Sequence, residues 1–313
     1  MPKTLFLFIL ALFFSSCGAK KADKIDDYIF KTKSAKNDYL KSYNKSLKLW
    51  KVPFKEEDLI TSYGTAHVII SGPKEAEPLL LLHGMDASST MWYPNIEALS
   101  KNHRVYAVDF LMEAGKSVSC GETLSKEEII TWYNEIFEHY KFKKIKVVGA
   151  SRGGWIATLL AIQENSNISK LALLSPAQTF ETIDSKRKAL PALMLKLFPN
   201  KKKLRRTLNA FAYYPKKIDT IYKNQFYLAN KHSKSNTSLL QMTPFSKEEL
   251  KSLTIPVLVL VGDHDVINSE DTVERAKKLI PNSEAEEIKN AGHFLTIDQS
   301  KIVNHKITEF LKD

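Results

Sequence analysis

A serine within a glycine-rich motif is the residue of this sequence best suited to chemistry. Ser151 lies in the run Gly149–Gly154, between an apolar stretch over 145–148 and another over 155–161. The pattern predicts a strand that turns sharply into a helix, with the serine at the turn. So tight a turn strains the backbone and projects the hydroxyl into open space, while glycines two positions away let the neighbouring backbone pass. We therefore expect Ser151 to be a nucleophile, with the amide of Arg152 directed at a developing oxyanion.

A nucleophilic serine needs two further side chains, and both types occur downstream. The hydroxyl reacts at neutral pH only with an imidazole within hydrogen-bond reach and a carboxylate that fixes the tautomer of that imidazole. A buried strand predicted over 255–261 ends in a loop that contains Asp263 and Asp265. A second strand-like stretch, 285–289, leads into a loop that contains His293. Open α/β sheets place their ligands at the carboxyl ends of the strands, where these loops would lie.

The order of these motifs resembles that of the α/β-hydrolase superfamily, in which the serine comes first, then the acid, then the histidine. The resemblance implies Ser151 as nucleophile, His293 as general base and Asp265, three residues past the strand-ending glycine, as the acid. Asp263 is the second choice of acid. Asp109 is a distant third, because it precedes the serine in the chain and suits a structural role.

The segment His83–Asp86 follows a wholly apolar run over 78–82 and resembles the oxyanion loop of the same superfamily. The resemblance implies that the backbone N–H of Met85 joins that of Arg152 in holding the developing negative charge. One such donor is typically worth roughly 3 to 4 kcal/mol of transition-state stabilisation. His83 then shapes the loop and is not a base. The Arg152 side chain either favours anionic substrates or points away into solvent, and we favour the second interpretation.

Four shorter segments resemble a bacterial carboxylesterase subgroup typified by enzymes that hydrolyse esters of arylpropionic acids: 49–54, 63–68, 71–73 and 83–92. The implied reaction is hydrolysis of a carboxylic ester through an acyl-enzyme intermediate on Ser151. The substrate would be a small ester with an apolar acyl or aromatic group, and neither a cofactor nor a metal is expected. Three alternatives stay open: other acyl-transfer or C–C bond hydrolase chemistry on the same triad, a non-catalytic ligand-binding envelope lipoprotein, and an interaction protein of the envelope for which the basic cap is the working surface.

Short apolar strands alternate with helical segments along most of the chain, which predicts an α/β fold with a mostly parallel, doubly wound sheet. The alternation is broken over 177–244, where the superfamily inserts a helical cap. The core would then comprise 36–176 and 245–313. We also expect an amphipathic helix over 37–50 and the antiparallel edge of the sheet over 62–70.

The predicted cap is rich in large apolar side chains, which could line an apolar pocket or form a small core of the cap itself. These residues are Leu190, Leu193, Met194, Leu197, Phe198, Phe211, Tyr213, Tyr214, Phe226 and Tyr227.

The first residues have the pattern of a bacterial lipoprotein signal. Lys3 precedes a short apolar run, which is followed by two serines and Cys17, so residues 1–17 predict a signal peptide and a lipidated cysteine. Residues 18–35 are polar and Lys-rich and predict a tether. The protein would be exported and lipid-anchored in the bacterial cell envelope. The alternatives are a soluble periplasmic or secreted protein and an uncleaved anchor, with Cys17 a bystander.

The chain is basic, with a formal net charge of +11, which becomes +10 once residues 1–17 and their single charged side chain are removed. The run Lys201–Arg206 would suggest nucleic-acid binding in a cytosolic protein, but export argues against that partner. A solvated helix face is the preferred interpretation, ahead of attraction to anionic lipid head groups. Lipidation of Cys17 would leave Cys120 alone, so the fold would rely on its core and not on a disulfide. The sequence does not indicate an oligomeric state.

Overall fold

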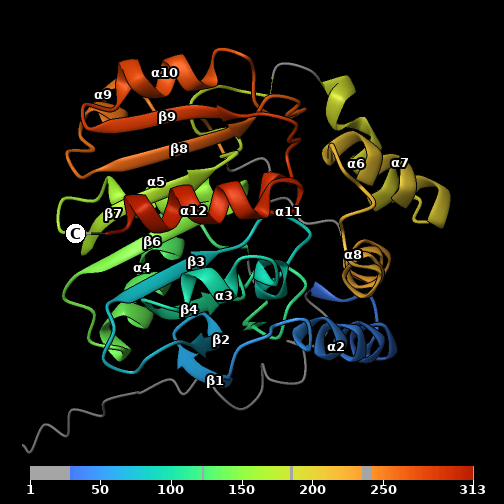
Figure 1. Ribbon diagram of the computed structural model, residues 1–313. Coiled ribbons are helices and arrows are strands. Elements are labelled where there is room, and N and C mark those ends of the chain that lie inside the picture. The colour runs from blue at the N-terminus through green and yellow to red at the C-terminus, as the bar shows by residue number, and fades with distance from the viewer. Residues whose placement is uncertain (1–28, 122, 184–185, 235–241, 313) are drawn as a thin grey trace, which may run out of the picture.

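The computed structural model describes residues 29–121, 123–183, 186–234 and 242–312. Within them, one mixed sheet carries the fold in the order β1-β2-β4-β3-β6-β7-β8-β9, and β5 pairs with β2 (Figure 1). Pairing is parallel from β4 to β9 and antiparallel at the three contacts of β2. The predicted α/β fold with a mostly parallel sheet is therefore confirmed. The strands are β1 Phe54–Thr61, β2 Gly64–Ser71, β3 Pro78–Leu82, β4 Arg104–Val108, β5 Val118–Ser119, β6 Ile145–Ala150, β7 Ile168–Leu174, β8 Val257–Gly262 and β9 Ser283–Ile288.

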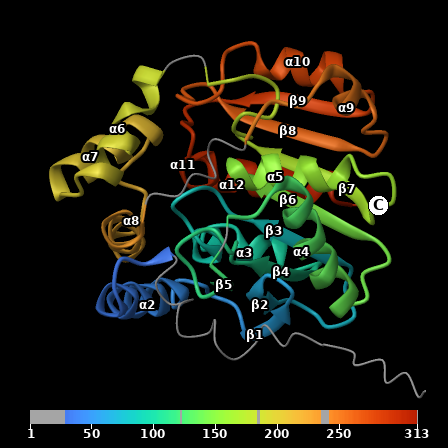
Figure 2. The same cartoon turned by 180° about the vertical axis from the view of Figure 1, so that it is seen from behind.

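Helices cover both faces of the sheet, as in a doubly wound fold (Figures 1 and 2). Helices α4, α5 and α10 contribute to one buried apolar cluster, and α3 and α12 to the other. None of the helices in the described ranges is both long and apolar enough to span a membrane. The helices are α2 Lys33–Leu47, η1 Ser89–Trp92, α3 Ile96–Leu99, α4 Lys126–His139, α5 Arg152–Ala161, α6 Lys186–Leu197, α7 Lys201–Phe211, α8 Thr220–His232, α9 Lys247–Lys251, α10 Thr272–Leu279, α11 Leu295–Asp298 and α12 Ser300–Phe310.

Strand β3 shows why its sequence is apolar throughout. Leu80 and Leu82 belong to the cluster on one face of the sheet, whereas Leu79 and Leu81 belong to the cluster on the other. Side chains alternate along a strand, so a strand covered by helices on both faces must be apolar at every position. The same rule explains the apolar run of β8, whereas β6 carries one buried lysine, Lys146, which is paired with Glu77. The carboxyl ends of both strands carry the chemistry discussed below.

The edge of the sheet differs from the prediction. We expected the antiparallel edge over 62–70, but β2 occupies that stretch and β1 pairs outside it. Strand β1 was missed because half of its sequence, FKEEDLIT, is charged and only Leu59 is buried. Edge strands are often charged, because charge discourages pairing with strands of other chains. Such a strand contains few apolar residues and gives little signal in the sequence.

Helices α6, α7 and α8 lie in the long insertion between β7 and β8, at the edge of the sheet where α2 also packs (Figures 1 and 2). Helix α2 lies along α8 in both views. The segment before α2 pairs with the end of α8: Phe30 forms a β-bridge with Ser233, and the Lys31 amide donates to the carbonyl of His232 over 2.9 Å.

These contacts correct the predicted N-terminal boundaries. The tether expected over 18–35 extends too far, because Ile29 and Phe30 are buried and α2 already begins at Lys33, capped by the Thr32 hydroxyl. The helix predicted over 37–50 accordingly begins and ends a few residues earlier. Packing against α8, which is remote in the sequence, orders a segment whose own composition is polar. Residues 1–28, with the predicted signal peptide and Cys17, lie outside the described residues.

Candidate active site

The serine turn between β6 and α5 has the strained geometry expected of it. Ser151 has φ of 52° and ψ of −117°, a left-handed conformation that is costly for a residue other than glycine. A Cβ added at Gly149 would lie 2.3 Å from the carbonyl oxygen of Gly153, and one at Gly153 would lie 2.1 Å from that of Leu82. Only glycine therefore permits the close approach of β3, β6 and α5. Ser151 itself is half-buried, and its hydroxyl makes no capping bond to α5.

The structure brings Ser151, His293 and Asp265 together from three separate loops. Nε2 of His293 lies 2.9 Å from Oγ of Ser151, and Nδ1 lies 2.9 and 3.1 Å from the two carboxylate oxygens of Asp265. A carboxylate only accepts hydrogen bonds, so Nδ1 carries the proton and Nε2 of the neutral ring is left to accept from the serine. The arrangement is a continuous chain for transfer of one proton.

Asp265 is buried and is held as a carboxylate by its partners. Burial opposes ionisation, but His293, the Ile267 amide and the Asn268 side chain together lower its pKa below the ordinary value. The Ile267 amide donates over 2.8 Å and the Asn268 side-chain amide over 2.9 Å. The second sequence candidate, Asp263, binds elsewhere: it accepts from the Ala291 amide and contacts His264.

Asp109, the third candidate, serves the backbone. Its two carboxylate oxygens each accept from a main-chain amide, that of Ser89 and that of Lys116, both over 2.8 Å. Asp109 is fully buried. These bonds tie the end of β4 to two neighbouring loops, which agrees with the structural role expected for this residue.

The loop after β3 lies directly against the serine. A Cβ added at Gly84 would lie 3.2 Å from Cβ of Ser151 and 3.8 Å from its Oγ, so the backbone that leads to Met85 passes beside the hydroxyl. Buried His83 shapes this loop: its Nδ1 donates to the carbonyl of Gly84 and its Nε2 accepts from the amide of Phe110, over 2.8 and 2.9 Å. That pattern requires a neutral ring, and burial lowers the pKa of His83 to about 4.

The expectation that the Arg152 side chain points into solvent is wrong. Arg152 is 2% exposed, its Nη1 lies 2.5 Å from Oε1 of Glu113, and its guanidinium lies 4.8 Å from the centre of the Phe110 ring. A buried cation requires a paired anion, which Glu113 supplies. The alternative reason for an arginine here, recognition of an anionic substrate, is weakened because Glu113 already neutralises the charge.

The ion pair continues towards the insertion. Oε2 of Glu113 accepts from the amide of Asp86, and the Asp86 carboxylate lies 2.5 Å from Nζ of Lys196 in α6. Lys196 also donates to the hydroxyl of Ser233 over 2.8 Å. Asp86 has φ of 55° and directly follows Met85. A series of charged residues therefore connects Arg152 to the loop after β3 and to α6: Glu113, Asp86 and Lys196.

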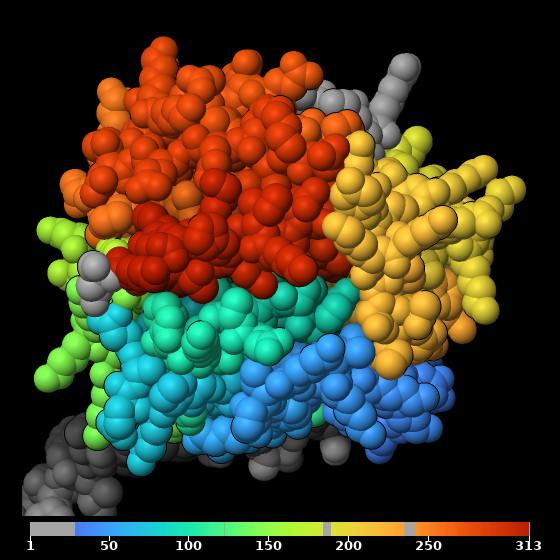
Figure 3. All heavy atoms as spheres, in the orientation of Figure 1, coloured from blue at the N-terminus to red at the C-terminus, as the bar shows by residue number. Residues whose placement is uncertain are grey.

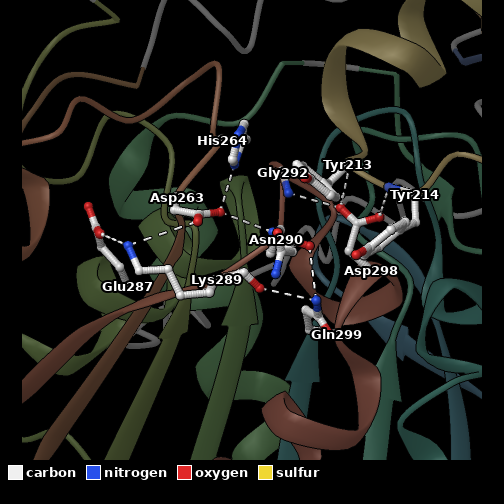
Figure 4. Close-up of polar contacts among 11 residues, drawn as sticks. Tyr213, Tyr214, Asp263, His264, Glu287, Lys289, Asn290, Gly292, Asp298 and Gln299 are labelled. Carbon is white, nitrogen blue, oxygen red and sulfur yellow. Dashed lines mark hydrogen bonds and ion pairs between the residues drawn. The ribbon is translucent and has the colours of Figure 1, made fainter.

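A second buried carboxylate fixes the histidine loop (Figure 4). Asp298 is fully buried and accepts from three main-chain amides: Tyr213 and Tyr214 over 2.8 Å and Gly292 over 2.9 Å. Gly292 precedes His293, whereas the two tyrosines follow α7. Asp298 thus joins the loop that carries the imidazole to the insertion.

The apolar residues predicted to line a pocket or a cap core range from buried to exposed. Phe211 and Phe226 are buried, and the Phe211 ring lies edge-on to the imidazole of His293 at 5.6 Å between centres. Leu190, Leu193 and Phe198 are exposed. Within the described residues no cluster of side chains could hold a metal ion. Cys120 is half-buried with a free thiol.

Sequence reasoning missed Glu113, Lys196 and Gln225. Each is a lone polar residue in its own segment, and its role comes only from a partner more than 25 positions away. Gln225 of α8 donates to the hydroxyls of Ser88 and Tyr39 and accepts from Thr90, within a buried network that joins α8 to the loop after β3. No local pattern distinguishes such residues.

Comparison with known proteins gives consistent matches over most of the chain. A family model described as alpha/beta hydrolase fold matches residues 77–300. A Bacillus subtilis (strain 168) protein named "Uncharacterized carboxylesterase nap" is 33% identical over 281 residues, which cover 87% of this chain and 91% of the relative. Carboxylesterase YbfK of the same organism is 29% identical over 275 residues, covering 87% and 93%. The crystal structure of naproxen esterase (carboxylesterase NP) from Bacillus subtilis matches with a TM-score of 0.82 and 34% identity, over 88% of this chain and 97% of that one.

The neutral, buried His83 predicts a pH dependence of stability. Because the pKa of His83 is lowered from 6.5 to about 4, the unfolded chain binds a proton between these values that the folded chain does not. This stabilisation is fully present above pH 6.5 and is lost as the pH falls, by about 2 kcal/mol at pH 5. His83→Gln, measured by urea unfolding between pH 7 and 5, should lose less free energy of unfolding than the wild type over that interval. His139→Gln, which removes an exposed histidine, is the control. An unchanged pH slope in His83→Gln would contradict the prediction.

Proposed function

The chain belongs to the α/β hydrolase family, and on that premise we propose that it hydrolyses carboxylic esters through an acyl-enzyme intermediate on Ser151. The hydrogen-bond chain from the Ser151 hydroxyl through His293 to Asp265 carries this proposal. The carboxylesterase names of two relatives, which this chain matches over 87% of its length, support the same reaction.

The steps of the reaction follow from the order of donors and acceptors, in which Ser151 donates to His293 and His293 donates to Asp265. Nε2 of His293 accepts the hydroxyl proton as Oγ of Ser151 attacks the ester carbonyl carbon, and Asp265 stabilises the imidazolium that forms. Collapse of the tetrahedral intermediate breaks the ester C–O bond, and His293 returns the proton to the leaving alcohol. Water then attacks the acyl-serine with His293 again as base, which releases the acid and restores the serine.

The oxyanion of each tetrahedral intermediate would be held by the backbone amides of Met85 and Arg152. Two observations support this assignment: the loop after β3 passes beside the Ser151 hydroxyl, and the Arg152 amide is the first of α5. Amides fixed in the backbone need no reorganisation as charge develops on the carbonyl oxygen, which makes them effective donors. Neither a cofactor nor a metal takes part in this scheme.

We expect the acyl group to be apolar or aromatic. One relative is named naproxen esterase, which describes an ester of an arylpropionic acid as the substrate of that protein. In this chain, the aromatic ring of Phe211 packs against the imidazole, and Glu113 neutralises the cation nearest to the serine. Both features favour an uncharged acyl group beside Ser151.

We propose a cap over 177–244 and a core that comprises 29–176 and 245–313, with its N-terminal boundary moved to the buried Ile29. For the N-terminal region we propose a signal peptide over 1–17 and a lipid on Cys17 that anchors the protein in the bacterial cell envelope. The positive residue, the short apolar run and the Ser-Ser-Cys ending of residues 1–17 support export and lipidation.

Removal of the serine hydroxyl should abolish both labelling and turnover. Ser151→Ala should not react with a fluorophosphonate probe and should lower kcat for p-nitrophenyl esters by about 10⁴-fold or more, because the covalent intermediate can no longer form. A wild-type series of p-nitrophenyl esters with increasing acyl length measures how large an acyl group the site accepts. Absence of labelling in folded wild-type protein would favour a binding role over hydrolysis.

Two aspartates on one loop offer a matched test of the acid. Asp265→Asn should lower kcat by about 10³- to 10⁴-fold, since a neutral amide cannot hold the same imidazole tautomer or stabilise the imidazolium. Asp263→Asn should retain kcat within about tenfold, because that carboxylate binds the Ala291 amide and not the imidazole. Steady-state kinetics on the two variants decides the matter, and equal losses would remove Asp265 from its assigned role.

The lipid anchor is tested at a single position. Cys17→Ser should incorporate no labelled palmitate and should leave the membrane fraction of a bacterial expression host, because the thiol is the acceptor. Cys120→Ser is the matched control and should incorporate label as the wild type does. Equal incorporation in Cys17→Ser and wild type would end the lipoprotein proposal and leave the soluble periplasmic or secreted alternative.

A further inference from the structure

Helix α6 buries Leu195 on one side and leaves a row of apolar side chains exposed on another. Lys196 points inward to Asp86 and Ser233 with a side chain that is only 14% exposed. Three leucines on the helix face outward: Leu190, Leu193 and Leu197 are 46%, 53% and 50% exposed. They are spaced at i, i+3 and i+7, so they form one stripe. Phe198, directly after the helix, is 58% exposed and extends the stripe.

Helix α7, which packs against α6, presents the complementary chemistry. Its buried side faces α6, where the Thr207 hydroxyl donates to the carbonyl of Pro191 over 2.8 Å. Its other side carries exposed cations: Lys201, Lys202, Arg205 and Arg206. The ammonium of Lys203 lies over the Phe198 ring at 4.7 Å, so the cationic helix and the apolar stripe meet. We call these four cations, the three leucines and Phe198 the docking surface.

We propose that the docking surface binds a lipid bilayer that contains anionic head groups, with the leucines and Phe198 entering the interface and the cations meeting the phosphates. Apolar side chains bordered by lysine and arginine are the composition that holds a helix in the plane of a membrane. Soluble proteins seldom leave several large apolar side chains exposed together without a partner. The helices that bear the surface protrude at one edge of the molecule (Figure 3).

The first described residues of the chain also lie beside the docking surface. Phe30 is bridged to Ser233, and Ser233 is bonded to Lys196 of α6, so the described chain begins beside the docking surface. Cys17 lies 12 residues before Ile29, a separation of at most about 40 Å even for an extended chain. An anchor at Cys17, as proposed above, would therefore keep this edge within reach of the membrane. The docking surface does not depend on the hydrolytic activity.

A second copy of the chain fits the docking surface less well than a bilayer does. A two-fold contact between identical surfaces would bring two sets of four cations near one another, and the described residues of the surface include no carboxylate to offset them. An anionic bilayer offers negative charge to the cations and hydrocarbon to the leucines at the same time. A bilayer can therefore contact both the cations and the apolar side chains of the docking surface.

A local probe tests the proposal on the full chain, whatever the N-terminus does. In a Cys17→Ser, Cys120→Ser background, which has no other cysteine, Leu197→Cys and the control Ile60→Cys are each labelled with an NBD fluorophore; Ile60 is 94% exposed on β1. Vesicles of phosphatidylcholine and phosphatidylglycerol should raise the emission at position 197 by about threefold and leave position 60 unchanged, because only the first enters the interface. Equal responses at the two positions would overturn the proposal.

The charge requirement is tested in the same assay. Replacement of Lys201, Lys202, Arg205 and Arg206 by Gln should lower the response at position 197 by at least about tenfold, whereas Lys143→Gln with Lys144→Gln, two exposed lysines before β6, should not. Vesicles of phosphatidylcholine alone should give the weak response of the Gln variant. A full response with phosphatidylcholine alone would overturn the proposal. A rise in emission with protein concentration in the absence of vesicles would also overturn it, and would indicate that a second copy of the chain binds the docking surface. Fluorophosphonate labelling of each variant reports separately on the serine.

Discussion

The strained backbone of Ser151 is the constraint on which the rest of the structure depends. A left-handed conformation at a residue with a side chain costs on the order of 1 to 3 kcal/mol, and it persists only where the surroundings impose it. Here β3, β6 and α5 approach so closely that Gly149 and Gly153 leave no room for a Cβ, and the Ser151 amide donates to the carbonyl of Leu174 in β7. Three parallel strands and one helix thus hold a single hydroxyl out of the regular structure, where it meets His293.

The imidazole needs the same precision but lies on a loop, so three carboxylates hold it in place of regular structure. Asp265 binds the ring itself, Asp263 accepts from the amide of Ala291, and Asp298 accepts from the amide of Gly292. Burial of the Asp265 and Asp298 carboxylates is costly unless their oxygens accept hydrogen bonds, and each accepts at least two. The two residues before His293 are therefore fixed by carboxylates from opposite sides. Asp298 also accepts from the amides of Tyr213 and Tyr214 after α7, so it connects the histidine loop to the insertion.

The sequence allowed prediction of the elements whose signals are local. An apolar run such as Leu79–Leu82 reports burial on both faces, and the glycines beside Ser151 report a turn, without knowledge of any partner. Strand β1 and the segment 29–35 could not be found in this way, because a charged edge strand and a polar segment owe their order to β2 and α8. The direction of the Arg152 side chain was predicted wrongly for the same reason. Glu113, which decides it, lies 39 positions away and has no motif of its own.

Arg152 and Glu113 show how an arginine beside a nucleophile can serve the fold and not the substrate. Burial raises the pKa of Glu113, and the Arg152 guanidinium limits that rise. Loss of Arg152 would remove the cation that pairs with the buried Glu113 carboxylate, a cost of roughly 3 to 5 kcal/mol. Glu113 also accepts from the amide of Asp86, next to the proposed oxyanion donor, and Asp86 binds Lys196 of the insertion. Because Glu113 balances the charge beside the serine, that charge is part of a structural network that reaches α6 through Asp86 and Lys196, and it is not free to bind a substrate anion.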